Sequence, residues 1–381
     1  MAVAALACSA PSNAESQPPD QPPAAASART PDPAQPIAKP LPPKPIPKIG
    51  KASATGRIVA AKIAVSVDGA PATDRPAYAR AGQSVVMFAV LVAEDGPGGK
   101  TRTTYSDAHE LSLGGAKVPH APLADAPLAE LRWNRIEPAV ATMTNGDTPA
   151  VFRFEPIDYR ATPMADGAGS LAADVRPTLT PDHGHGVGTM RYQLVALQGD
   201  RVVASAGPEA RRGKGSGGLT DAVARVSIRR DDTYLGYLTE MFGQPYIWAS
   251  AGITDATHQS ERLEGSDCAD FVVYAARRMG KKLAYTWTGG LPGITTLLAA
   301  GTRGADGVYR DKKGVPLPYT QAGDLVLFPR HVGVLAADRG QPGVLDDQDL
   351  MMHTLFDSPK EQAIADSGYA DKDLELRRLR K

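Results

Sequence analysis

The sequence has few cysteines, no net charge and no long apolar run, and each shortage argues against a class of protein. Cys8 and Cys268 are the two cysteines among 381 residues, and the Pro-rich stretch between them argues against a structural disulfide. Lysine plus arginine and aspartate plus glutamate number 42 each, so the overall charge does not point to a nucleic acid partner. No run of about 18 apolar residues is present, so the sequence predicts no membrane-spanning helix. The partner must therefore be selected by a local site.

The N-terminal residues carry features of an exported protein. Residues 1–8 read as the remnant of an apolar export signal, and their ending Ala5-Leu6-Ala7-Cys8 resembles the cleavage box of bacterial lipoproteins. The resemblance implies export to the periplasm or envelope, with Cys8 as a candidate lipidation site and a lipid anchor in the membrane. Simple cleavage of the signal, or an ordinary Ala-rich start, are the alternatives. Residues 9–52 are rich in proline and poor in large apolar side chains, which predicts a disordered linker.

Residues 53–210 have the pattern of an all-β domain. Short runs such as RIVAAKIAVSV, QSVVMFAVLVA and TMRYQLVAL are separated by Gly, Pro and Asp clusters. Gln198-Gly199-Asp200 is suited to a hairpin turn, because glycine accepts a positive φ. Regular strand spacing without a convincing helix predicts a β-sandwich, of which the immunoglobulin-like kind is one candidate.

In residues 225–381 helical patterns come first and strand patterns follow. Apolar residues recur at helical spacing after Asp231. A second helix is expected between Asp267, which can cap its start, and Gly280, which can end it. The later runs GDLVLF, HVGVLAAD and DLMMHTLFD predict successive antiparallel strands. This order predicts an α+β domain.

Cys268 is the candidate nucleophile. It falls in the first turn of the second predicted helix, where unpaired backbone N–H groups and the helix dipole favour an anion. We expect this position to lower the pKa of the thiol and to supply donors for an oxyanion. The alternative is an inert buried cysteine that acts as a small apolar side chain.

His331 and His353 are the candidate partners of that thiol. Antiparallel pairing of the strands that carry them would bring the two imidazoles side by side. One histidine could then act as the base and the other could orient it through a hydrogen bond, as a Cys-His catalytic pair requires.

Four motifs occur in the order GQPYIW, DCADF, GDLVLF followed by HVGV, and MMHT. This order resembles the NlpC/P60 family of cysteine peptidases over residues 230 to 358. The resemblance implies a papain-like α+β fold and hydrolysis of amide bonds in peptidoglycan stem peptides, without a metal or organic cofactor. It implies that Cys268 is the nucleophile, His331 the base and His353 the orienting residue. It also implies that Tyr246 lines the substrate cleft and that Asp267 helps to hold the amino end of the stem peptide.

The chain departs from the family pattern on the substrate side. The family's Asp-Cys-Ser-Gly-Phe is replaced by Asp267-Cys268-Ala269-Asp270-Phe271, and its Trp-Gly-Gly by Trp248-Ala249-Ser250. Asp270 thus adds a carboxylate to the predicted substrate site. These changes keep two alternatives open, namely a thiol amidase that acts on another envelope amide or on a small peptide or acyl substrate, and a non-catalytic envelope-binding protein.

The remaining histidines give weaker signals. His258 has no obvious partner nearby in the sequence and is expected at the surface. His183 and His185 lie in a glycine-rich loop without further ligands, so we expect no metal there.

Overall fold

The computed structural model describes residues 45–95, 101–148, 151–213 and 215–380. The export signal predicted for residues 1–8, the lipidation of Cys8 and most of the linker predicted for residues 9–52 lie outside this range. Residues Ile46–Lys381 form one compact unit. The predicted linker ends too late, because Lys48–Ile49 already forms a strand, β1, which pairs with β9.

The protein is mostly β, with 42% strand and 11% helix. The predicted fold class, an α+β papain-like domain after an all-β domain for which an immunoglobulin-like sandwich was one candidate, is therefore wrong. Within the described residues the α-helices are α1 (Tyr234–Leu238) and α2 (Cys268–Arg278). Much of the C-terminal segment forms strands that the sequence pattern did not reveal. In β19 (Thr295–Arg303), for example, most side chains are exposed, so no apolar alternation marks the strand.

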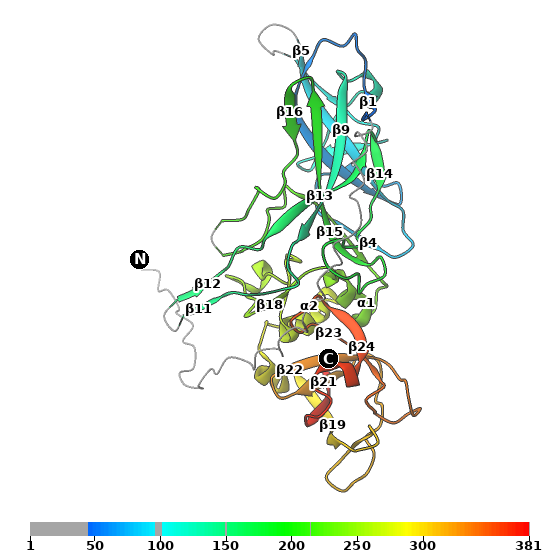
Figure 1. Cartoon of the computed structure of the whole chain (residues 1–381), viewed down its shortest axis with the longest axis vertical. Coiled ribbons are helices and arrows are strands. Elements are labelled where there is room, and N and C mark those ends of the chain that lie inside the picture. Colours follow the sequence, from blue (N-terminus) through cyan, green and yellow to red (C-terminus); the bar gives the residue numbers. More distant parts are fainter. Residues whose placement is uncertain (1–44, 96–100, 149–150, 214, 381) are drawn as a thin grey trace, which may run out of the picture. The chain divides into compact units, whose positions relative to one another are not determined.

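Two seven-stranded sheets make up the β-rich region before α1. The strands of the first sheet are β1, β4 (Ala77–Arg80), β9 (Ala129–Pro138), β13 (Tyr159–Asp166), β15 (Gly188–Gln198), β16 (Arg201–Ala204) and β17 (Ala224–Arg229). The strands of the second sheet are β2 (Arg57–Val67), β3 (Ala72–Thr73), β5 (Val85–Asp95), β6 (Thr101–Tyr105), β7 (Leu111–Leu113), β8 (Ala116–Lys117) and β14 (Ser170–Ala172). The two sheets share one apolar core, with Met87 and Leu91 of β5 in the same cluster as Trp133 and Leu194 (Figure 1). The predicted hairpin at Gly199 is present, with φ +59° between β15 and β16.

A third seven-stranded sheet follows in the order β20-β19-β25-β21-β22-β23-β24. Its remaining strands are β20 (Tyr309–Arg310), β21 (Leu325–Phe328), β22 (His331–Ala337), β23 (Leu350–His353), β24 (Lys360–Ala363) and β25 (Leu374–Leu379). Helix α2 packs on one face of this sheet, where its apolar side chains share a core with Leu325, Val332 and Val334 (Figure 1). The 3-10 helices are η1 (Leu123–Asp125), η2 (Thr239–Met241), η3 (Asp255–Thr257), η4 (Thr288–Gly293) and η5 (Ile364–Ser367).

Two short ladders complete the structure, and one of them joins the β-rich region to the strand that carries Tyr246. Strand β10 (Thr142–Thr144) pairs in parallel with β18 (Tyr246–Trp248), and β11 (Gly146–Thr148) pairs with β12 (Val151–Arg153). Next to the first ladder, Asn145 donates its amide N–H to the carbonyl oxygen of Ala249 over 2.8 Å. The β-rich region therefore contributes directly to the surroundings of Tyr246.

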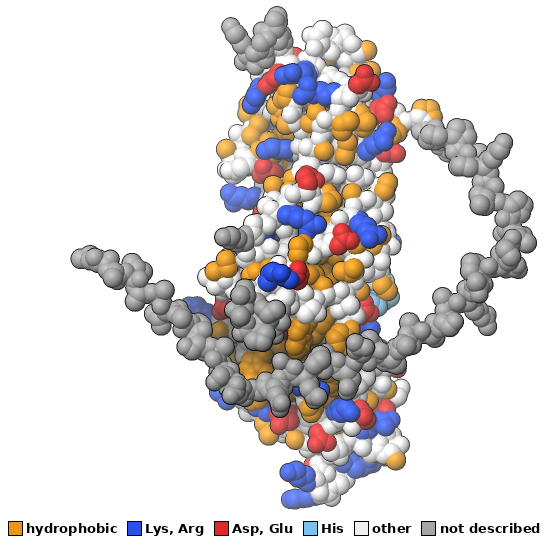
Figure 2. Space-filling model, turned by 60° about the vertical axis from the view of Figure 1, so that its left-hand side comes forward, with side chains coloured by type: hydrophobic (Ala, Val, Ile, Leu, Met, Phe, Trp, Pro, Cys, Tyr) orange, Lys and Arg blue, Asp and Glu red, His pale blue; other side chains and the backbone are white. Residues whose placement is uncertain are grey.

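The described surface gives no strong electrostatic direction. On the face shown in Figure 2, acidic and basic side chains are interspersed, in keeping with equal numbers of each in the sequence. Among the described residues, no helix has the length and apolarity needed to cross a bilayer.

Candidate active site

Cys268 occupies the first position of α2. Asp267 caps this helix, because its side chain accepts the backbone N–H groups of Ala269 (3.0 Å) and Asp270 (2.9 Å). The thiol is buried, with 6% of Cys268 exposed, and Val332 of β22 offers it a backbone hydrogen bond. The helix start thus places the sulfur against the strand that begins at His331.

His331 and His353 meet inside the protein. The Nε2 atom of His331 lies 2.9 Å from Nδ1 of His353, and both rings are buried. The ladder between β22 and β23 pairs Val334 with Met352, so Gly333 rather than His331 lies opposite His353. The two histidines are therefore diagonal neighbours on one face of the sheet. A Cβ at Gly333 would lie 3.3 Å from Cβ of His353, so the glycine leaves the space in which the imidazoles meet.

The remaining nitrogen of each ring in this pair has no hydrogen-bond partner among the described residues. These atoms are Nδ1 of His331 and Nε2 of His353. Since buried polar atoms are nearly always satisfied, two such atoms in one pair need a reason. A reacting group at Nδ1 of His331 is one such reason. That atom can accept a proton if Nε2 of the same ring donates to His353.

The three side chains are uncharged at rest. Burial raises the pKa of the Cys268 thiol, and the acidic side chains Asp267 and Asp270 add to this effect. The expectation that the helix start lowers this pKa is therefore wrong for the resting protein, because desolvation outweighs the helix dipole. Burial also lowers the pKa of His331 well below its usual value and that of His353 to about 3. The site thus contains a neutral thiol at the start of α2 and a neutral imidazole pair on β22 and β23.

Three aromatic side chains enclose this centre. Tyr246 is buried, and burial raises its pKa, with smaller effects from the neighbouring Cys268 and Asp267. Phe356, from the loop after β23, packs edge-on against Tyr246 with ring centroids 5.4 Å apart. The ring of Tyr369, from the loop after η5, lies 4.7 Å from the His331 ring, centroid to centroid, and burial raises the pKa of Tyr369, with a smaller effect from Cys268. No motif in the sequence marks Tyr369, so its place near His331 could not be predicted.

The two departures from the family pattern meet on the other side of Cys268. The hydroxyl of Ser250 donates to Oδ2 of Asp270 over 2.6 Å and accepts the backbone N–H of Asp267 over 2.9 Å. The two carboxyl groups influence each other, since Asp270 raises the pKa of Asp267, whereas Asp267 lowers that of Asp270. Burial raises the pKa of Asp270 to about 7 and that of Asp267 well above its usual value. Asp267 and Asp270 thus form a coupled carboxyl pair rather than two free charges.

His258 belongs to this second cluster, so its predicted place at the surface is wrong. It is 4% exposed, its Nε2 lies 3.3 Å from Oδ2 of Asp270, and its Nδ1 accepts the backbone N–H of Ser260. Its ring stacks on Tyr285 with centroids 3.7 Å apart, and burial lowers its pKa to about 4. The two substitutions of glycine by Ser250 and Asp270 were the available signal that a polar partner is buried nearby.

Strained backbone also gathers around the site. Among the described residues, six other than glycine have positive φ angles, and three of them adjoin the clusters above: Ala249 (+56°), Arg330 (+66°) and Phe356 (+52°). Such conformations cost free energy and concentrate at functional sites. Ala249 stands where the family pattern has glycine, which explains why glycine suits that position.

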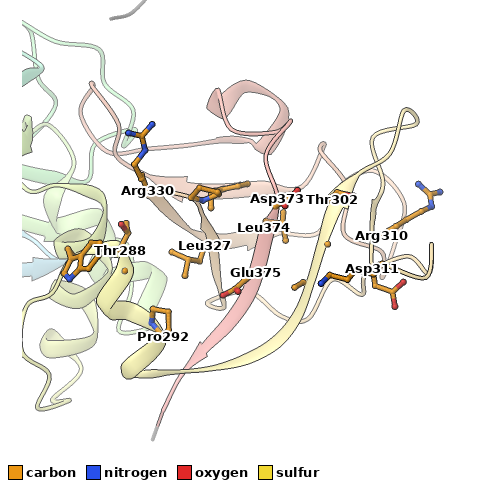
Figure 3. Close-up of a pocket in the computed structure, with 17 residues that line it drawn as sticks. Thr288, Pro292, Thr302, Arg310, Asp311, Leu327, Arg330, Asp373, Leu374 and Glu375 are labelled. Carbon is orange, nitrogen blue, oxygen red and sulfur yellow. The ribbon is translucent and has the colours of Figure 1, made fainter. Parts of the chain in front are cut away.

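A cavity of about 580 Å³ lies along the third sheet next to this centre. Figure 3 shows Thr288 and Pro292 on one side, Arg310 and Asp311 on the other, and Leu327 between them. Cys268 and His331 do not line the cavity, but its wall includes Arg330, which directly precedes His331. Leu327 packs in the same core cluster as Cys268. Leu327 and Arg330 thus link the wall of the cavity to the elements that carry Cys268 and His331.

Within the described ranges, no group of three acidic, histidine or cysteine side chains is arranged to hold a metal ion. His183 instead contacts Asp357, with Nε2 3.1 Å from Oδ2, and so ties the β-rich region to the loop that carries Phe356.

No family model, no curated protein and no solved structure matches this chain.

Proposed function

We propose that this protein is an exported cysteine hydrolase that cleaves an amide bond in peptidoglycan stem peptides, as the motif resemblance to NlpC/P60 peptidases implies. The observation that carries the proposal is the buried His331–His353 pair, in which Nδ1 of His331 is unpaired among the described residues. His331 begins β22, the strand against which α2 presents Cys268. A thiol, a base and an orienting group are the parts that covalent amide hydrolysis requires.

In the proposed reaction, His331 acts as a general base rather than as half of a preformed ion pair. Its Nδ1 takes the thiol proton as the Cys268 sulfur attacks the carbonyl carbon. His353 accepts the Nε2 proton of His331 in a hydrogen bond and so fixes the tautomer that leaves Nδ1 free. The protonated His331 then gives its proton to the leaving amine, and water hydrolyses the thioester.

The oxyanion needs donors that are not already in use. The N–H groups of Ala269 and Asp270 are bonded to Asp267, which leaves the backbone N–H of Cys268 as the donor at the helix start. The Tyr246 hydroxyl lies close enough to Cys268 for the thiolate charge to raise its pKa. These two groups form the proposed oxyanion hole.

One observation favours a second candidate within the same chemistry. Asp267, which would hold the amino end of a stem peptide, is already bonded to the start of α2 and coupled to Asp270. A thiol amidase that acts on another envelope amide, or on a small peptide or acyl substrate, would not need a free Asp267.

Mass spectrometry of purified peptidoglycan incubated with wild-type protein, with Cys268→Ala and with Cys8→Ala tests the proposal. We expect new stem-peptide fragments with the wild type and with Cys8→Ala, and none with Cys268→Ala. The masses of the fragments identify the bond that is cut. Identical traces for the wild type and Cys268→Ala would contradict the proposal, and turnover of small amides in the same samples would then favour the second candidate.

A further inference from the structure

Trp287 presents an exposed indole ring in the wall of the cavity along the third sheet. The residue is 74% exposed, although tryptophan side chains in folded proteins are mostly buried. The ring is nevertheless held in place. A Cβ at Gly289 would lie only 2.3 Å from Cη2 of the indole, so the ring rests against this glycine. Gly290 donates its backbone N–H to the carbonyl oxygen of Trp287 over 2.8 Å, which fixes the turn below the ring. An ordered aromatic ring with an open surface is suited to pack against a ligand.

Three strands of the third sheet supply another part of the wall. Ala300 of β19 and Leu327 of β21 are both in register with Glu375 of β25, so the three side chains lie next to each other on one face. Thr288 of η4 and Thr302 of β19 add hydroxyl groups to the wall (Figure 3). The cavity thus combines apolar surface with groups that donate and accept hydrogen bonds.

The charged side chains of the wall balance each other. They comprise three acidic and three basic residues, namely Asp311, Asp373, Glu375, Arg310, Lys312 and Arg330. Two of them are fixed by their neighbours. Arg310 donates two hydrogen bonds of 2.7 Å to Asp306, and the carboxyl group of Asp311 accepts the backbone N–H of Lys313 over 2.8 Å. A wall without net charge does not select an ionic ligand, whereas fixed polar groups favour a neutral ligand with many donors and acceptors.

A saccharide combines the properties that this wall requires. A sugar ring has a face of C–H groups, which packs against the negatively polarised face of an aromatic ring, and a rim of hydroxyl groups that donate and accept. The cavity volume of about 580 Å³ lies in the range of small-molecule binding sites. A proline-rich peptide also binds aromatic surfaces, but proline has no N–H to donate to the carboxylates of the wall.

We propose that this cavity is a saccharide-binding site in which one sugar ring stacks on Trp287. The ligand in this scheme is the glycan strand of peptidoglycan, and that assignment rests on the proposed function. Arg330 lies in the cavity wall and directly precedes His331, so a sugar bound there contacts the chain segment that leads into β22.

Calorimetric titration of the full-length protein with an oligomer of β-1,4-linked N-acetylglucosamine tests the site. We expect saturable binding by the wild type and a dissociation constant at least about tenfold higher for Trp287→Ala. Trp287→Phe keeps a smaller aromatic face and is expected to weaken binding by about threefold. Ile253→Ala is the matched control and should bind as the wild type does, because Ile253 is 71% exposed but lies outside the cavity wall.

Tryptophan fluorescence identifies the ring that contacts the sugar. The chain has three tryptophans, of which Trp133 is fully buried and Trp248 lies outside the cavity wall. Addition of the oligomer is expected to change the emission of the wild type but not that of Trp287→Phe. A change that persists unaltered in Trp287→Phe overturns the assignment of the ring.

The outcomes distinguish this inference from the proposed function. Absence of saturable binding by the wild type overturns the inference, even if peptidoglycan is cleaved, and so does equal binding by the wild type and Trp287→Ala. Binding that depends on Trp287 supports the site even if no peptide bond is cut, and in that case only the proposed function fails. Tighter binding of a polyproline peptide than of the oligomer, lost in Trp287→Ala, would make the cavity a peptide site and would also overturn the inference.

Discussion

Two buried histidine clusters flank Cys268, and they differ in what their ring nitrogens do. His258 uses both nitrogens, one as the acceptor for Ser260 and the other toward Asp270, and its ring is stacked on Tyr285. In the pair of His331 and His353, each ring uses one nitrogen in their mutual contact, and the other nitrogen has no partner among the described residues. Both clusters are buried to a similar degree, so burial alone does not distinguish them.

The difference shows how a histidine available for chemistry can be separated from a structural one. A ring with both nitrogens engaged has no acceptor left for a proton from a substrate or a nucleophile. A ring with one unpaired nitrogen leaves a polar atom unsatisfied, a cost that a functional site can justify. On this comparison His331 is the base and His258 stabilises the carboxyl pair.

The largest expected effect is that of replacing His331. His331→Gln removes the base, and we expect kcat/KM for a cleaved peptide to fall by a factor of about 10³. His258→Gln leaves the base in place, and we expect a fall of less than about tenfold together with a loss of about 1–3 kcal/mol in the free energy of unfolding. Steady-state kinetics and urea unfolding of both variants measure these effects. Equal losses of activity in the two variants would remove the distinction between the clusters.

Acidification is expected to act mainly through the histidine pair. The pKa values of His353 (about 3) and His331 lie below the value of about 6.5 in the unfolded chain, so the unfolded state takes up protons first as the pH falls. Their contribution to stability is complete above about pH 6.5 and is lost as the pH drops toward the folded values, at up to about 1.4 kcal/mol per pH unit for each ring.

In the second cluster the pH effects oppose each other. The pKa of His258, lowered to about 4, makes stability fall on acidification, whereas that of Asp270, raised to about 7, makes stability fall as the pH rises from about 4 to 7. Urea unfolding at pH 7.5, 6 and 5 should therefore show that the free energy of unfolding falls less steeply with decreasing pH for His353→Asn than for the wild type. The double variant His258→Gln with Asp270→Asn should leave the slope nearly unchanged. A change of slope in the double variant alone would contradict this assignment.

The smallest expected effect concerns the strained backbone beside Ser250. Ala249 has a φ of +56°, a conformation that costs a side chain about 1–2 kcal/mol and costs glycine almost nothing. Ala249→Gly should therefore raise the free energy of unfolding by about 0.5 kcal/mol, after allowance for the greater freedom of glycine in the unfolded chain. Ala284, which is exposed and lies outside the positive-φ set, is the matched control, and Ala284→Gly should lower stability slightly. Thermal unfolding that shows a loss for both variants would argue against strain at Ala249.

Local signals in the sequence predicted those parts of the structure that depend on neighbouring residues. Asp267 caps α2 and Gly280 follows its end, because caps and glycine stops act within a few residues. The contact between His331 and His353 was also expected, although the observed register is shifted and the contact is diagonal. A pleated strand tolerates that shift, since side chains two residues apart face the same side.

Features that depend on distant segments could not be predicted in this way. The fold class was wrong because strands with exposed faces, such as β19, carry no apolar alternation. His258 lies in a loop that brings it next to Asp270, which is bonded to Ser250, and hydrophobic periodicity does not predict the course of a loop. The state of the thiol was mispredicted because burial, which the sequence does not display, outweighs the position at the helix start.

The parallel ladder between β10 and β18 makes the β-rich region part of the structure that supports the proposed active site. Residues 142–144 supply the hydrogen-bonding edge for the strand that carries Tyr246. A fragment that began at residue 225 would therefore leave that edge without its partner, and an uncovered strand edge is prone to join other chains. The chain that precedes the motifs thus pairs with the strand that carries Tyr246 and forms part of the fold around it.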